Sequence, residues 1–319
     1  MASVDGKSGE HSTELRVVIA VDPDGGARDA MTLGSVLARQ LGIAPLLVHV
    51  FPLTFNFPGP AHVDVEWRDY LREGARIWLA ECADFMAREL GWPEVEVLAH
   101  GCATTAQGLI EVAETRPTWA IVVGSARGAA SGRFAIGSTV DKLLHSSPAA
   151  VATAPQGYWN DGIEAVDRVV VAFQDTPESR AAVATATRAA QRGQVALRLL
   201  TVLLRHRMYG SALRTEAESI VMAQLREDYE RSQREVLDSL PTDIEADALM
   251  LSGDSVSSAL RRTSWTGAEI MVVGSAEGGQ LRRVFLGDMT HRLVQAAPVP
   301  TVVLTRRTLA TEAEGMGAG

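Results

Sequence analysis

The sequence carries the same pattern twice, about 150 residues apart, and this repeat limits the folds open to the chain. The run Val-Val-Gly-Ser occurs at residues 122–125 and again at residues 272–275. Four more landmarks keep offsets of 150 to 152 residues: Gly137 and Gly287, Pro148 and Pro298, Gly101 and Gly253, and the strand-like runs 17–22 and 169–174. A constant offset over five landmarks indicates a tandem duplication, and 319 residues are enough for two domains with separate cores.

Each copy alternates short runs of β-branched residues with long stretches of helical pattern. The first copy predicts strands at 16–21, 46–51, 95–100, 119–124 and 149–153. The second copy predicts strands near 168–173, 195–203, 243–250, 269–274 and 301–305. Because strands that alternate with helices form right-handed βαβ units, we expect an α/β fold. Each copy should form an open five-stranded parallel sheet covered by helices on both faces.

The domain boundaries are predicted from composition along the chain. Residues 154–167 are rich in turn-forming residues, and we interpret them as a linker between a first domain at 15–153 and a second domain at 168–306. Residues 1–14 are polar, and residues 307–319 contain several glycines and alanines. We therefore expect both ends of the chain to be disordered.

Charge and cysteine content argue against several classes of function. The formal net charge of −9 disfavours nonspecific nucleic-acid binding, which requires a basic surface. Cys82 and Cys102 have no CxxC spacing, so we expect neither a zinc site nor a disulfide but two reduced thiols. The polar start of the chain does not resemble a signal peptide, and no apolar stretch has the length of a membrane helix. These features predict a cytoplasmic protein that acts away from membranes and nucleic acids.

Two glycine-rich loops carry the strongest chemical signal. In an open parallel sheet, ligands bind at the carboxyl ends of the strands, where Asp22 and the loop that begins at Gly124 are expected. Glycines let the backbone approach a phosphate, and a helix that starts near Gly137 would point free N–H groups into the loop. Ser138 is predicted as the N-cap of that helix and as a phosphate contact. The alternative is that the loop is only a tight strand-to-helix connection.

The order of these features resembles the universal stress protein family. The resemblance rests on a strand that ends in Asp22, on the Val-Val-Gly-Ser run, and on Gly137-Ser138 thirteen residues after Gly124, and it extends over both copies. It implies a Rossmann-like fold and, in members with the signature G-x2-G-x9-G-[S/T], ATP held in the loop, with Mg²⁺. Carried over residue by residue, the implied nucleotide site comprises Asp22, Val50, Gly124, Arg127, Gly128, Gly137, Ser138 and Thr139.

The signature is altered in both copies, and more severely in the second. Arg127 stands at the middle glycine position of the first copy, with the glycine displaced to Gly128. In the second copy Glu277 occupies the middle position, Gln174 replaces the aspartate, and Asp288 follows the last glycine. Two carboxylates near a phosphate would repel it. We therefore expect any nucleotide site to lie in the first copy.

Three functions remain open from the sequence. The first is a stress-response or regulatory module that binds an adenine nucleotide in the first copy. The second is a relative that binds no nucleotide and acts through contacts with an unknown protein partner. The third and weakest is a slow ATP hydrolase, because no general base or metal ligand is evident beside the loop.

The resemblance also implies how the two copies are arranged. In this family the last strand of each domain often pairs antiparallel with that of another domain. We therefore expect an internal pseudo-dimer, which could itself form a homodimer, because open strand edges favour association. His49, at the end of the second predicted strand, is expected to be a hydrogen-bonded structural histidine instead of a catalytic residue.

Overall fold

The computed structural model describes residues 14–23, 25–53, 63–126, 131–204, 212–274, 288–305 and 308. Within these ranges the side chains of residues 63–65, 212–219 and 288 are not described. The predicted disordered ends lie almost wholly outside the described residues. So do Arg127, Gly128 and Glu277, which belong to the two glycine-rich loops.

The first repeat has the alternating order predicted from the sequence. Its strands are β1 (Arg16–Ala20), β2 (Ala44–Pro52), β3 (Glu96–Cys102), β4 (Thr118–Gly124) and β5 (Ala150–Ala154). Its helices are α1 (Ala27–Leu41), α2 (Val63–Glu89), α3 (Thr105–Thr115) and α4 (Ser138–Ser146). The helix ends have sequence causes: Gly42 closes α1 in the left-handed conformation, and the Thr104 side chain caps α3.

The second repeat follows the same order. Its strands are β6 (Arg168–Ala172), β7 (Ala196–Leu204), β8 (Ala246–Gly253), β9 (Glu269–Gly274) and β10 (Thr301–Leu304). Its helices are α5 (Pro177–Gly193), α6 (Ala212–Ser239), α7 (Val256–Leu260) and α8 (Asp288–Ala296). A proline in the first turn and the Thr176 cap start α5, and Ser255 caps α7.

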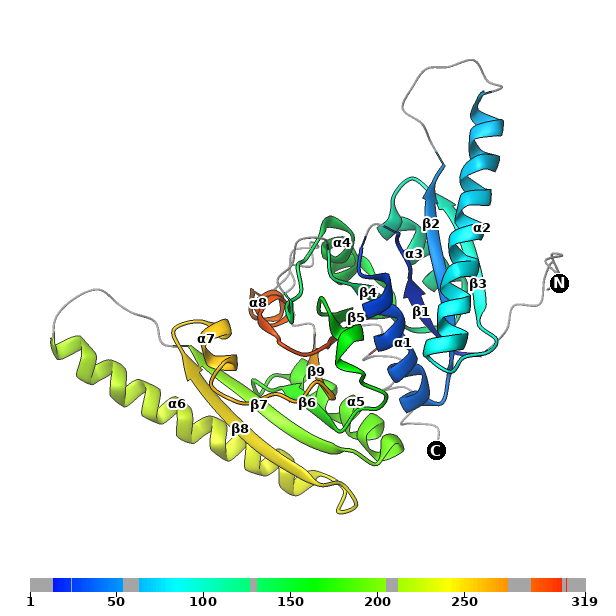
Figure 1. Ribbon diagram of the computed structural model, residues 1–319. Coiled ribbons are helices and arrows are strands. Elements are labelled where there is room, and N and C mark those ends of the chain that lie inside the picture. The colour runs from blue at the N-terminus through cyan, green and yellow to red at the C-terminus, as the bar shows by residue number, and fades with distance from the viewer. Residues whose placement is uncertain are drawn as a thin grey trace.

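The ten strands of the described residues join in one continuous sheet with the order β3-β2-β1-β4-β5-β10-β9-β6-β7-β8. Neighbouring strands are parallel within each repeat, and the junction between β5 and β10 is antiparallel (Figure 1). At the junction Val302 lies opposite Ala152, and the Thr153 hydroxyl donates to the carbonyl of Thr301 at 3.2 Å. The predicted internal pseudo-dimer is therefore confirmed, with each repeat supplying the strand that closes the other's edge.

Helices cover both faces of the sheet, but the two faces are built differently. On one face the helices α1, α2, α5 and α6 share a single apolar cluster that runs through both repeats, because α1 packs against α5. On the other face α3 and α4 cover a cluster centred on the first repeat, and α7 and α8 cover a separate one in the second. Strand residues alternate between the faces: Val17 and Ile19 enter the shared cluster, and Val18 points to the other side.

The segment between the repeats is packed against both of them. Residues 154–167 begin with the end of β5 and include a short 3-10 helix, η1 (Tyr158–Asp161). Tyr158 is only 2% exposed and belongs to the shared cluster. The Trp159 ring packs edge-on against Phe85 of α2, with ring centroids 4.8 Å apart.

Candidate functional site

A cavity of about 350 Å³ opens at the carboxyl ends of β1 and β4, where the winding direction of the first repeat reverses. Five of the eight predicted site residues line it: Asp22, Gly124, Gly137, Ser138 and Thr139. Asp22 follows the end of β1 by two residues, and Gly124 ends β4. Gly137 is the N-cap of α4, and Ser138 and Thr139 are its first two residues. Residues about 115 positions apart in the sequence thus meet because parallel strands present their carboxyl ends at one edge.

The N-terminus of α4 faces this cavity without a side-chain cap. Gly137 is the N-cap, with φ −90° and ψ 173°, and it makes no side-chain cap hydrogen bond. The prediction that Ser138 is the N-cap is wrong, because Ser138 already has helical geometry as the first residue of α4. The N–H groups of the first turn have no partner within the helix, so they and the positive end of the helix dipole are available to an anion.

Gly124 serves packing as well as the cavity. Gly26, with φ +42°, lies directly over the end of β4, and a Cβ atom added to Gly26 would lie 2.9 Å from the Gly124 Cα. A Cβ on Gly124 would in turn meet the backbone of Gly26 at its carbonyl carbon, 2.6 Å away. The turn between β1 and α1 therefore rests on the β4 loop, and both positions require glycine for this contact.

A buried serine closes the base of the glycine-rich loop. Ser125 is 4% exposed, and its hydroxyl accepts a hydrogen bond from the backbone N–H of Ala135 at 2.9 Å. The N–H of Ala126 also donates to the Ala135 carbonyl, at 3.4 Å. The two arms of the loop are thus joined at its base. Ser125 was not among the site residues predicted from the sequence. The signal that could have identified it is the recurrence of the Val-Val-Gly-Ser run, which ends at Ser125.

Val50 does not line the cavity. Its side chain packs on α3, where Gly108 comes so close that an added Cβ would lie 2.7 Å from a Val50 methyl group. The neighbouring His49 is hydrogen-bonded, as predicted for a structural histidine. Its Nδ1 lies 2.8 Å from the Val21 carbonyl oxygen. The Trp78 indole N–H donates to the same carbonyl at 3.3 Å. These contacts hold the ends of β1 and β2 together behind the cavity.

The equivalent place in the second repeat holds a smaller cavity of about 160 Å³. Phe173, Gln174 and Met289 line it, where the first repeat has Val21, Asp22 and Thr139. The Gln174 N–H donates to the Ser179 hydroxyl at 3.3 Å, so that backbone group is already engaged. Asp288 begins α8, but its side chain and residues 275–287 lie outside the described residues.

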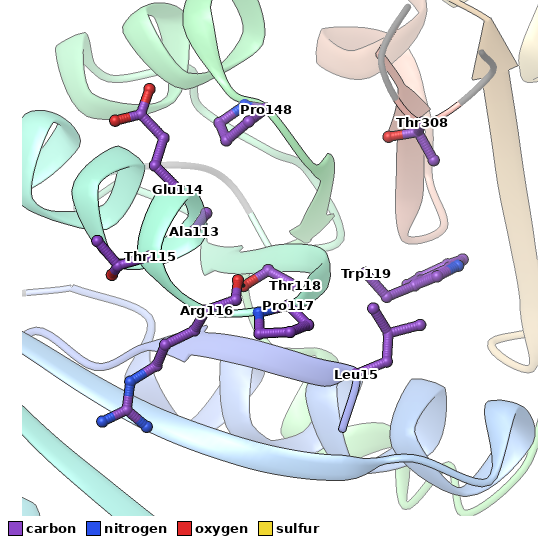
Figure 2. Close-up of a pocket in the computed structure, with 10 residues that line it drawn as sticks. All are labelled: Leu15, Ala113, Glu114, Thr115, Arg116, Pro117, Thr118, Trp119, Pro148 and Thr308. Carbon is purple, nitrogen blue, oxygen red and sulfur yellow. Dashed lines mark hydrogen bonds between the residues drawn. The ribbon is translucent and has the colours of Figure 1, made fainter. Parts of the chain in front are cut away.

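A larger cavity of about 480 Å³ lies at the opposite, amino end of the sheet, beside the C-terminus of α3 (Figure 2). Leu15, Pro117 and Trp119 give it an apolar floor, and the Arg116 side chain points away from Trp119. Arg116 pairs with Glu96 on β3. Because a helix C-terminus presents carbonyl groups, this place lacks the anion-binding geometry found at α4.

The described part of the chain contains no group of three or more histidine, cysteine or acidic side chains arranged to hold a metal ion. A search of the same residues also finds no helix with the length and apolar character needed to cross a membrane. Cys82 and Cys102 are both free and buried.

Two α/β repeats, each with a cavity at the carboxyl ends of its parallel strands, define a tandem protein built from two open-sheet α/β domains. The model of the universal stress protein family matches the chain twice, at residues 15–155 and 165–305, and the chain belongs to this family.

Curated relatives and solved structures show the same resemblance over most of the chain. Universal stress protein Rv2319c of Mycobacterium tuberculosis is 29% identical over 252 residues, which cover 77% of this chain and 85% of the relative. A universal stress protein structure from Archaeoglobus fulgidus has a TM-score of 0.59 at 18% identity and covers 92% of this chain and 99% of its own. The functionally unknown protein PA1789 of Pseudomonas aeruginosa has a TM-score of 0.57 at 13% identity, with 97% and 98% covered. These two structures share the fold.

Proposed function

We propose that this tandem universal stress protein is a stress-response module that binds an adenine nucleotide, ATP foremost, in its first repeat. The observation that carries the proposal is the cavity that is lined both by Asp22 and by the uncapped start of α4. Backbone N–H groups at a helix N-terminus bind phosphate oxygens, and a carboxylate suits the hydrogen-bond donors of a ribose or an adenine amino group.

Gly137 supplies an independent argument. Its backbone angles are accessible to any residue, and among the described residues an added Cβ would meet only the Ala126 Cβ, at an ordinary 3.5 Å. The fold therefore has no need of glycine at this position, in contrast to Gly124 and Gly26. Close approach of a phosphate to the backbone would account for it.

The described residues that line the cavity include no lysine or arginine. Phosphate contacts would therefore come from the α4 N–H groups and from the Ser138 and Thr139 hydroxyls. Mg²⁺, which is commonly held by nucleotide phosphates and water, would enter with the nucleotide. The cavity of the second repeat is smaller and has Gln174 in the place of Asp22, which supports a single site for each chain.

Titration calorimetry with ATP and Mg²⁺ tests the proposal on four proteins: wild type, Gly137→Ala, Gly137→Asp and the control Gly287→Asp in the second repeat. We expect wild type to bind one nucleotide per chain. Gly137→Asp should weaken binding by at least about 100-fold, because it places a charge and a side chain at the phosphate position. Gly137→Ala should weaken it less, and its melting temperature should fall only slightly, because alanine is less favourable than glycine at a helix N-cap.

The control separates the two repeats. Gly287→Asp should leave affinity and stoichiometry unchanged. Loss of binding in Gly287→Asp alone would move the site to the second repeat. Absence of ATP binding by the wild-type protein would reject the proposal and favour a module that acts through protein contacts.

A further inference from the structure

The segment between the repeats is hydrogen-bonded to the glycine-rich loop of the candidate site. The N–H of Gly132 donates to the Gln156 carbonyl at 2.9 Å, and the N–H of Gln156 donates to the Arg133 carbonyl at 2.9 Å. Gly132 and Arg133 lie on the arm of the loop that returns to Gly137. The shape of this arm therefore depends on where Gln156 is held.

One buried carboxylate holds the next residues of the same segment. Asp29, in the first turn of α1, is only 8% exposed. Its Oδ2 accepts a hydrogen bond from the Gly157 N–H at 3.0 Å, and its Oδ1 accepts one from the Trp159 N–H at 2.8 Å. Burial raises the pKa of Asp29 above its usual range, and the two N–H donors partly offset this effect. Burial of a charged acid is unfavourable unless hydrogen bonds compensate for it, and here both compensating bonds come from the inter-repeat segment.

Asp29 is also close in sequence to the other wall of the cavity. Gly25 lines the cavity, and α1 begins two residues later. The loop arm that leads to Gly137 and the first turn of α1, which follows Gly25, thus both bond to the inter-repeat segment at residues 156–159.

The far end of the segment is fixed to the second repeat. The N–H of Asp167 donates to the Ala268 carbonyl at 3.0 Å, and the Thr266 hydroxyl donates to the Asp167 carboxylate at 3.1 Å. A single stretch of about a dozen residues therefore connects the glycine-rich loop of the first repeat, called the ligand loop below, to the residues just before β9 in the second.

We propose that Asp29 is a positioning residue for the ligand loop: by holding residues 157–159 it fixes Gln156 and, through Gln156, the arm at Gly132 and Arg133. Through the same contacts, a ligand bound in the cavity restricts the motion of the inter-repeat segment. The effect on affinity rests on the proposed nucleotide function, whereas the effect on the loop does not.

The physical reason is conformational entropy. Without Asp29, two N–H groups in a partly buried segment lose their acceptor, and Gln156 is held less firmly. The loop arm then samples more conformations, and a ligand must bear the cost of ordering it. Affinity should fall even though Asp29 is not among the residues that line the cavity.

The test uses the full chain with a graded series, Asp29→Asn and Asp29→Ala, and the control Thr32→Ala. Asparagine keeps one acceptor oxygen and replaces the other with a donor, whereas alanine removes both. Thr32 is a buried residue of the same helix whose hydroxyl donates to the Arg28 carbonyl within α1. Hydrogen exchange at the amides of Gly132, Gln156, Gly157 and Trp159 and calorimetry with ATP and Mg²⁺ are measured on all four proteins.

We expect exchange at these four amides to accelerate from wild type through Asp29→Asn to Asp29→Ala. ATP affinity should fall in the same order, by about tenfold for Asp29→Asn. Thr32→Ala should lower the melting temperature while leaving the four amides and the affinity near wild type. In wild type, ATP should slow exchange at Gly157 and Trp159.

The outcomes separate the inference from the proposed function. If Asp29→Asn leaves exchange at Gly132 and Gln156 unchanged, the inference is overturned whether or not ATP binds. If exchange accelerates but affinity does not fall in a protein that binds ATP, Asp29 does not position the ligand loop. If wild type fails to bind ATP, the proposed function falls, and faster exchange at Gly132 and Gln156 still supports the structural coupling. Should Asp29→Ala fail to fold, Asp29→Asn and the wild-type response to ATP decide the matter.

Discussion

At the residue scale, glycines of the same region differ in whether the surrounding atoms leave room for a side chain. Gly26 and Gly124 are needed because the backbones of two turns touch, whereas Gly137 has room for a side chain. From the sequence, Gly124 and Gly137 were both expected to let the backbone approach a phosphate, since a motif records the residue type but not the atoms around it. The distinction makes Gly137 the informative position for binding experiments, because a Cβ atom there would make only an ordinary contact with the described residues.

Cys82 offers a residue-scale prediction on reactivity. It lies in α2 and is 2% exposed, and burial, with a contribution from the Glu81 charge, raises its pKa to about 12. Since the thiolate is the reactive form, we expect native Cys82 to be alkylated by iodoacetamide at pH 8 at least about 100-fold more slowly than in the urea-unfolded chain. Peptide mass spectrometry of timed samples measures both rates. Equal rates in the two states would contradict the burial of this thiol.

At the scale of elements, helix α1 contacts strands of its own repeat and a helix of the other. It packs on β1 and β4, contacts α5 of the other repeat, and carries Asp29 at its first turn. Its approach to the sheet is set by Gly34, which faces Ile19 of β1 so closely that an added Cβ would lie 2.5 Å from the Ile19 Cγ1. A helix position without a side chain brings the helix axis nearer to the strand and buries both surfaces fully.

A double-mutant cycle tests this contact. Gly34→Ala should destabilise the protein by about 1–3 kcal/mol, because the new methyl group overpacks the core, despite the higher helix propensity of alanine. In an Ile19→Ala background, which removes the opposing atoms, the same change should cost much less or stabilise the protein. Urea unfolding of the four proteins gives the coupling free energy. Additive effects would show that Gly34 and Ile19 do not set the helix position.

At the scale of the whole molecule, the antiparallel pairing of β5 and β10 makes one ten-stranded sheet out of two five-stranded ones. Each repeat on its own would expose the edge of its last strand. The duplication satisfies both edges within one chain and leaves β3 and β8 as the outer strands. The shared apolar cluster under α1 and α5 joins the repeats on one face as well.

Separation of the repeats should therefore change the association state. A fragment of residues 1–163 keeps η1 and the acceptor contacts of Asp29 but loses the partner strand of β5. We expect it to dimerise or aggregate, as measured by light scattering, with a melting temperature that depends on protein concentration. The full chain under the same conditions serves as the reference. A monomeric fragment as stable as the full chain would contradict the importance of the junction.

The sequence by itself determined the repeat, the alternation of strands and helices, and the end of the sheet at which the first glycine-rich loop begins. These are local or periodic properties: apolar runs predict buried strands, and a constant offset predicts a duplicated domain. The expectation that Asp22, Gly124 and Gly137 lie together also followed from the sequence, because topology alone brings the carboxyl ends of strands to one edge.

Only the tertiary structure decided the contacts that join distant segments. Asp29 holds Trp159 across 130 residues, and no spacing rule links an acid in a first helical turn to a linker that far away. The closure of the loop by Ser125, the displacement of Val50 onto α3 and the start of α4 at Ser138 also depend on how neighbouring elements pack. The physical reason is that hydrogen bonds and packing at such positions are set by atoms brought within a few ångströms only after the sheet has assembled.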